Sequence, residues 1–119
     1  MGTLTTKLTL NSTNALSDST NVSITDTLTI ADPTELSRKS IATDSATNIR
    51  TTSDSSITYV YLKNMDTTNI IVVKTDGGVA FADLNPGEFA FLPLKGAVGL
   101  EVQADTAACV LEYGYWTKG

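Results

Sequence analysis

The sequence contains no histidine and only one cysteine, Cys109. Histidine supplies most proton transfer near neutral pH and is the commonest metal ligand, so a Ser-His-Asp site is excluded and metal ligands are scarce. A single cysteine also excludes a disulfide within the chain. Cys109 lies in an apolar run, and we interpret it as a small buried hydrophobe and not a nucleophile. We therefore expect no enzymatic activity, no cofactor and no metal.

Basic residues are also few, because eight lysines and arginines stand against thirteen aspartates and glutamates, for a net charge of −5. No long basic run occurs, which makes nucleic acid an unexpected partner. No apolar stretch approaches the roughly 18 residues of a membrane span, and the N-terminus lacks the apolar core of a signal peptide. We expect a soluble protein that is made in a cytoplasm and does not bind membranes.

The chain has the size of one domain, residues 1–119, with a single core. Its 41% hydrophobic content is sufficient for such a core, but not for two. The composition changes at about residue 57. The part before it is rich in serine and threonine, whereas all phenylalanine, tyrosine and tryptophan residues lie after it. The second half should therefore supply the aromatic core.

Two amphipathic strands are predicted near the N-terminus. Thr3–Leu10 and Asn21–Ile30 carry apolar residues at alternate positions, with threonines between them. Each strand should bury its apolar side and expose its threonine side. Asp32–Glu35 then has the form of a capping box with proline at the first helical position, so it suits one helical turn or a turn into a short strand.

Thr43–Ser56 is the most polar stretch and predicts a loop, in which Ile49 marks a short strand. Strand-like segments then recur every eight to twelve residues, with turn sequences between them. Asp76-Gly77-Gly78 predicts a hairpin, because both glycines accept a positive φ. The strands expected in this half are 57–62, 70–73, 79–84, 89–94, 98–103 and 107–116. This spacing predicts an all-β fold, an antiparallel β-sandwich of the jelly-roll type.

The segment Asn85–Leu94 carries the clearest turn. Pro86 presets φ for the first corner and Gly87 accepts a positive φ at the second, which predicts a type II turn that closes a hairpin. The strand after this turn is apolar on both faces, as is typical of a strand buried between two layers. The residues expected to be largely buried are Phe89, Phe91, Leu100, Val102, Val110 and Leu111.

Two groups of side chains are candidates for a site. Tyr113, Tyr115 and Trp116 are a candidate ligand platform for stacking on a sugar. They also suit a closing core strand or an interface with a neighbouring subunit, and we favour these two interpretations over sugar binding. Catalytic carboxylate pairs are conceivable, and Asp83 and Glu88, which flank the Pro-Gly turn, are close enough in sequence to approach each other across a hairpin. Acidic side chains beside a surface turn are usually only solvated, so we assign this pair no catalytic role.

The second half of the chain resembles small structural proteins encoded among the head and tail genes of tailed bacteriophages. The resemblance rests on a Tyr-rich strand ending in Lys63-Asn64, the turn Pro86-Gly87-Glu88, the segment Gly99–Ala104 and the closing strand Glu112–Trp116. Pro-Gly-Glu turns also occur in cupins, but the metal-binding histidines of cupins are absent here. The resemblance implies a non-enzymatic virion protein, most simply a capsid decoration or cement protein that stabilises the capsid lattice.

This resemblance also implies partners, namely the major capsid protein or other virion proteins, and a location in the virion. The Thr-rich strand faces and the aromatic C-terminus predict a homo-oligomer, and so do the few large core residues of the N-terminal half, which would gain burial from a neighbour. The resemblance favours a trimer. The competing hypothesis is a carbohydrate-binding or adhesin module, such as a head fibre or a tail-associated component for host attachment.

Overall fold

The computed structural model describes residues 2–14, 19–50 and 56–119, which form strands joined by turns and loops and contain no helix. This part of the chain accordingly has no helix that could cross a membrane. Every strand pair in it is antiparallel, which confirms the all-β prediction. In chain order the strands are β1 (Gly2–Ser12), β2 (Thr20–Ile41), β3 (Thr47–Arg50), β4 (Thr58–Asn64), β5 (Ile71–Thr75), β6 (Ala80–Leu84), β7 (Phe89–Leu94), β8 (Leu100–Ala104) and β9 (Cys109–Lys118).

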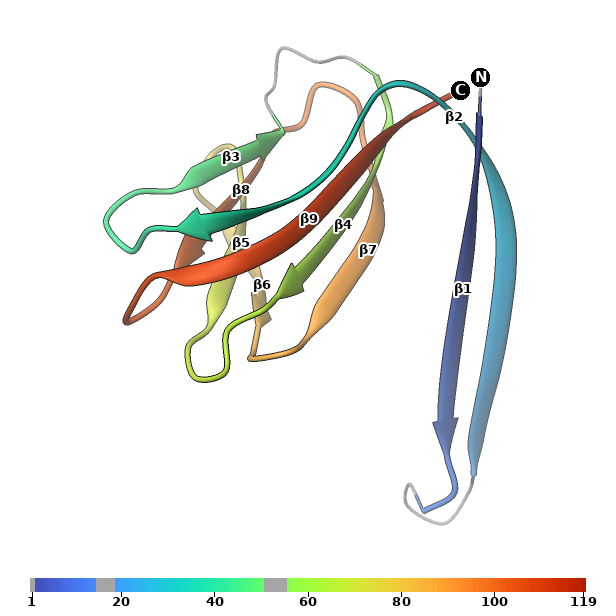
Figure 1. Ribbon diagram of the computed structural model, residues 1–119, viewed down its shortest axis with the longest axis horizontal. Helices are drawn as coiled ribbons and strands as arrows, with labels where there is room; N and C mark the ends of the chain where they lie inside the picture. Colours follow the sequence, from blue (N-terminus) through green and yellow to red (C-terminus); the bar gives the residue numbers. More distant parts are fainter. Residues whose placement is uncertain (1, 15–18, 51–55) are drawn as a thin grey trace.

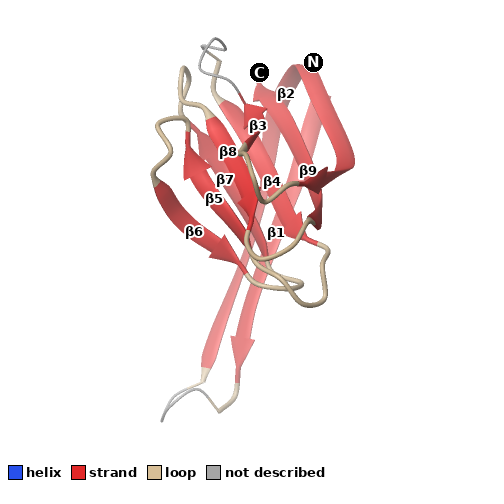
Figure 2. Ribbon diagram, turned by 90° about the vertical axis from the view of Figure 1, so that its left-hand side faces the viewer, coloured by secondary structure: helices blue, strands red, loops and turns tan. Residues whose placement is uncertain are grey.

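The strands form two layers, which can be followed in Figure 2. One sheet has five strands in the order β1-β2-β9-β4-β7, and the other has four in the order β3-β8-β5-β6. Among the described strands, only β1–β2 and β5–β6 are neighbours both in the chain and in a sheet. Every other connection leads from one sheet to the other. Two antiparallel sheets that enclose a common core fit the predicted β-sandwich.

The core consists of the aliphatic side chains that each sheet turns toward the other. Leu100, Val102 and Leu111 were predicted to be buried, and the structure confirms all three. The short strand predicted around Ile49 is also present as β3, whose partner is β8. The buried residues of this core are Ile41, Val60, Leu62, Ile71, Val73, Leu84, Leu94, Leu100, Val102, Ala104, Cys109, Leu111 and Tyr113.

Three residues that were predicted to be buried are exposed, and for them the prediction was wrong. Phe89 and Phe91 have 59% and 39% of their surface exposed, and Val110 is exposed as well. The reason is that successive side chains of a strand point to opposite sides of the sheet. In β7, an edge strand, Leu92 and Leu94 face the second sheet and the phenylalanines face away from it. Val110 likewise lies on the outer side of β9.

Strand β2 is long enough to belong to two parts of the molecule. Its first half pairs with β1 in register from Gly2 opposite Ile30 to Ser12 opposite Thr20, and its second half pairs with β9. The two pairings meet at Ile30, which lies opposite both Gly2 and Lys118, and the pairing with β9 has a bulge between Ala31 and Thr34. The hairpin of β1 with the first half of β2 projects from the sandwich (Figure 1), and we call this hairpin the arm.

The capping-box segment forms no helical turn. Thr34 and Glu35 continue β2 as extended backbone, because they pair with Trp116 and Tyr115 of β9. The helical option considered from the sequence was therefore wrong. Pairing along a neighbouring strand satisfies the backbone groups that a capped helical turn would have satisfied locally.

The Pro-Gly segment adopts the turn that its sequence indicates. Gly87 has a φ of 81°, and the backbone amide of Glu88 donates a hydrogen bond of 2.9 Å to the carbonyl of Asn85. The turn does not close a hairpin, however, because β6 pairs with β5 and β7 pairs with β4. That part of the prediction was wrong: turn chemistry reverses the chain locally but does not choose the partner of the next strand. The hairpin predicted at Asp76-Gly77-Gly78 is confirmed between β5 and β6.

Replacing Gly87 with alanine is expected to lower the free energy of unfolding by about 1 kcal/mol, since an L-residue is strained at positive φ. A Cβ at this position would meet no atom within 4 Å, so the loss would come from the backbone alone. Gly77→Ala is a matched control in a turn, because Gly77 does not have a positive φ. Urea unfolding of both variants measures the difference, and equal stability would contradict the turn assignment.

Candidate functional site

The arm has one aliphatic face and one threonine face. The register places Leu8 opposite Ile24 and Leu10 opposite Val22, all on the same face. These four side chains remain exposed, by 37% to 54% of their surface. The amphipathic pattern predicted for the two strands is therefore confirmed, but its burial is not, because this end of the arm extends away from the sandwich (Figure 1). We call these four residues the arm face.

The five-stranded sheet presents aromatic side chains on its outer side, beside the arm. Tyr61 of β4 lies opposite Phe91 of β7, and Lys63 lies opposite Phe89. Phe91 also stacks on the buried Tyr59, with ring centroids 6.3 Å apart and planes 11° from parallel. This stacking fixes Phe91 on the outer side of the sheet. We call Tyr61, Phe89 and Phe91 the aromatic wall.

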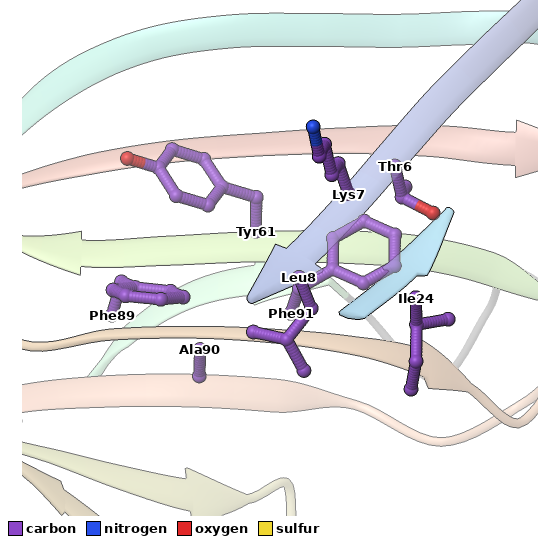
Figure 3. A pocket seen from close by; sticks show the side chains of 8 residues that line it. All are labelled: Thr6, Lys7, Leu8, Ile24, Tyr61, Phe89, Ala90 and Phe91. Carbon is purple, nitrogen blue, oxygen red and sulfur yellow. The ribbon is translucent and has the colours of Figure 1, made fainter. Parts of the chain in front are cut away.

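A cleft of about 500 Å³ separates the arm from the aromatic wall (Figure 3). Its lining is mainly apolar, and one of its residues, Lys7, is charged. Clefts of this kind suit apolar side chains of a protein partner better than a charged small molecule. The lining residues are Thr6, Lys7, Leu8 and Ile24 from the arm and Tyr61, Phe89, Ala90 and Phe91 from the sheet.

A polar cluster holds Tyr61 at the edge of the cleft. The Tyr61 hydroxyl donates to Oε1 of Glu112 at 2.8 Å, and Nε of Arg38 donates to Oε2 at 3.0 Å. Burial, and then the hydrogen bond to Glu112, raises the pKa of Tyr61 to about 12. The hydrogen bonds from Tyr61 and Arg38 lower the pKa of Glu112. Near neutral pH the phenol is therefore protonated and the carboxylate ionised, an arrangement that orients the ring.

Alkaline pH is expected to weaken the fold through Tyr61. Because its pKa is higher in the folded than in the unfolded chain, the stabilisation is complete below about pH 10 and is lost as the pH rises toward 12. The free energy of unfolding, measured in urea at pH 8 and at pH 11, should fall less between the two pH values for Tyr61→Phe than for the wild type. Other tyrosines titrate in both proteins, so the difference isolates Tyr61. Equal losses would contradict this assignment.

The structure does not bring the predicted aromatic platform together. Tyr113 and Tyr115 pack on the core side of β9, and Trp116 lies on the outer side, opposite Tyr59. The Tyr113 hydroxyl donates to Oε1 of Glu35 at 3.0 Å, so its polar end is already bonded. Adjacent residues of a strand point to opposite faces, and this alternation separates Tyr115 from Trp116.

The acidic residues beside the Pro-Gly turn, Asp83 and Glu88, line one surface pocket together with Leu84, Gly87 and Phe89. Oε1 of Glu88 accepts hydrogen bonds from Nδ2 and the backbone amide of Asn85, and these bonds lower the pKa of Glu88. Asp83 lies on β6, opposite Val72. Within residues 2–14, 19–50 and 56–119, no three residues among histidine, cysteine, aspartate and glutamate gather into a candidate metal site.

Sequence reasoning missed the cleft, although part of its signal was present. The few large core residues before residue 57 indicated strands that gain burial from a neighbour. The exposure of Phe89 and Phe91 could not be seen, because it depends on which side of β7 faces the second sheet. Comparison with known protein families, with curated proteins and with solved structures finds no match to this chain. The arm and the aromatic wall are thus the features from which a function can be inferred.

Proposed function

We propose that the protein is a non-enzymatic structural component of a tailed-phage virion, of the capsid decoration or cement type. The observation that carries the proposal is the arm, which exposes Leu8, Leu10, Val22 and Ile24 together on one face. A two-stranded hairpin is at best marginally stable in water, and removing an aliphatic face from water is favourable. Such an arm suits a protein whose neighbours in an assembly bury its exposed aliphatic side chains.

The strand order supports the jelly-roll part of the prediction. Strands β2, β3, β4 and β5 pair with β9, β8, β7 and β6, respectively. This is the pairing of one long hairpin wrapped into two layers. Jelly rolls occur in viral capsid domains and also in lectins, so the topology alone is compatible with both hypotheses about function.

The carbohydrate-binding alternative would place a sugar on the aromatic wall. Sugar binding needs polar groups that fix the orientation of the ligand beside the stacking rings. On the arm side the cleft supplies only Thr6 and Lys7 for this purpose. The three-ring platform predicted at the C-terminus is divided between two faces. We therefore place the structural role first.

The expected partner is the major capsid protein or another virion protein. Strand β1 pairs only with β2 among the described strands, so its other edge is available to a strand of a partner. The charges of Lys7 and Asp26, the ionisable residues within the arm strands, cancel. We therefore expect contacts through apolar surface and backbone, with a weak dependence on salt.

Co-sedimentation with capsids assembled without this protein tests the proposal. The wild type should bind, and Leu10→Asp should bind at least about tenfold more weakly, because it charges the arm face. Thr9→Asp is the matched control, since it adds the same charge on the threonine face and should bind like the wild type. Failure of the wild type to bind, or equal binding of both variants, would refute the proposal. Binding to glycans without binding to capsids would favour the adhesin alternative.

A further inference from the structure

Two apolar surfaces of the chain face each other but leave a cleft between them. Leu8 and Ile24 of the arm line one side, and Phe89 and Phe91 of the aromatic wall line the other (Figure 3). All four side chains remain exposed. The arm and the aromatic wall are thus both apolar and lie on the same chain, but the contact between them is incomplete.

We propose that copies of this protein exchange arms, so that the arm face of one copy packs on the aromatic wall of a second copy. Leu8 and Ile24 of one copy would then cover Phe89 and Phe91 of its neighbour. The inference rests on the proposed role as an assembly component and names a partner for the cleft. Within one copy, the cleft keeps the arm face and the aromatic wall from full contact. Arm exchange forms this contact between two copies and therefore uses only surfaces that each copy already has.

The architecture makes the arm separable from the sandwich. Strand β1 pairs only with the first half of β2 among the described strands, and β9 pairs with β2 from Ile30 onward, with a bulge between Ala31 and Thr34. A backbone change confined to this bulge would redirect the whole arm. The pairing within the arm would be kept. Of the contacts with the C-terminal strand, those that precede the bulge would be lost, namely Ile30 with Lys118, Ala31 with Thr117 and the hydrogen bond from the Gly119 amide to the Thr29 carbonyl.

Charge favours contact through the arm over contact through the rest of the surface. The chain has a net charge of −5, whereas Lys7 and Asp26 cancel within the arm strands. The arm strands therefore bring no net charge to the contact, and Asp26, opposite Thr6, is the one of the two that lies on the side of the arm face. The pairing of aliphatic with aromatic side chains is also typical of the buried centre of a protein interface.

The area of contact has the size of a weak interface. The aromatic wall lies on β4 and β7, and β7 has 6 residues. At about 3.3 Å per residue and a width of about 10 Å, this surface covers about 200 Å². Reciprocal exchange covers two such surfaces and the two arm faces on them, about 800 Å² in total, which is the size of a weak, reversible interface.

Sedimentation equilibrium of the purified protein between about 1 and 100 μM, without any capsid, tests the exchange. The wild type should associate, and Ile24→Asp should weaken the association at least tenfold. Thr25→Asp is the matched control, because it puts the same charge on the threonine face of the same strand, and it should associate like the wild type. A wild type that stays monomeric, or an Ile24→Asp variant that associates normally, would overturn the inference.

A mixing experiment separates arm exchange from arms that simply pack on each other. Ile24→Asp damages the arm face and Phe89→Asp damages the aromatic wall, so each variant alone should be monomeric. In the mixture, the intact arm of one variant can dock on the intact wall of the other, and association should partly return. No return of association in the mixture would overturn arm exchange.

Cross-linking gives an independent test if these charged variants fold poorly. Leu8→Cys and Phe89→Cys are prepared as separate proteins, mixed and oxidised mildly. The native Cys109 is buried and should not compete. Arm exchange predicts a mixed disulfide dimer in excess of the wall-to-wall dimer, and its absence would overturn the inference. Capsid binding by a protein that never self-associates would refute arm exchange but leave the proposed function standing.

Discussion

Replacing Leu62 with alanine is expected to lower the free energy of unfolding by about 3–5 kcal/mol. Leu62 has no exposed surface and lies on β4, which is paired on both sides, with β9 and with β7. Its side chain points into the core between the two sheets, and the surrounding strands cannot easily collapse into the space left by the substitution. Equilibrium unfolding in urea, followed by circular dichroism, measures the loss.

Phe91→Ala is the comparison for this prediction. The sequence alone placed Phe91 in the core, but 39% of its surface is exposed on the outer side of the sheet. Removing this partly exposed ring should therefore cost only about 1–2 kcal/mol. A loss at Phe91 as large as the loss at Leu62 would show that the core has been assigned to the wrong side of the sheet.

Replacing Asn64 with leucine is expected to cost about 3 kcal/mol or more. Asn64 is fully buried, and its Nδ2 donates to the carbonyls of Asn69 at 2.9 Å and Leu84 at 2.8 Å. Its Oδ1 accepts from the backbone amide of Asp66 at 2.9 Å. Leucine has a similar volume but leaves all three partners without this hydrogen bond, at about 1–3 kcal/mol for each group that stays buried.

The large effect at Asn64 has a structural cause. The side chain ties the end of β4 to the loop after it and to the end of β6, and the backbone of Asn64 is hydrogen-bonded to Gly87 and Glu88 of the Pro-Gly turn. Asn85→Ala is the control, because Asn85 is exposed and its side chain bonds only to Glu88. Urea unfolding should show a change below about 1 kcal/mol for this control. A similarly small change for Asn64→Leu would contradict the role assigned to its hydrogen bonds.

Most strands and turns could be predicted because their signals are local. Alternation of apolar and polar residues identifies a strand, and glycine in a turn sequence identifies a turn. Gly78 and Gly87, for example, both have a positive φ in the structure. The role of Asn64 could not be predicted in this way. In the sequence it reads as the beginning of a polar turn, and its burial depends on carbonyls contributed by β6 and by the following loop.

The candidate site could be predicted only in part, because it depends on how the strands are placed relative to one another. The apolar and threonine faces of the arm strands were evident from alternation, but nothing local indicates that the hairpin before Ala31 projects from the sandwich (Figure 1). The exposure of Phe89 likewise depends on which side of β7 faces the second sheet, and that side carries Leu92 and Leu94. For Tyr115 and Trp116 the alternation was available, and applying it would have separated them at once.

Cryo-microscopy of the intact virion, at a resolution that shows side chains, tests the central claim most directly. We predict that the map contains this β-sandwich bound to the protein lattice, with Leu8, Leu10, Val22 and Ile24 of each arm covered by a neighbouring chain. A virion that lacks the protein would contradict the proposed function. A virion in which the protein is present but its arm faces stay open to solvent would contradict assembly through the arm.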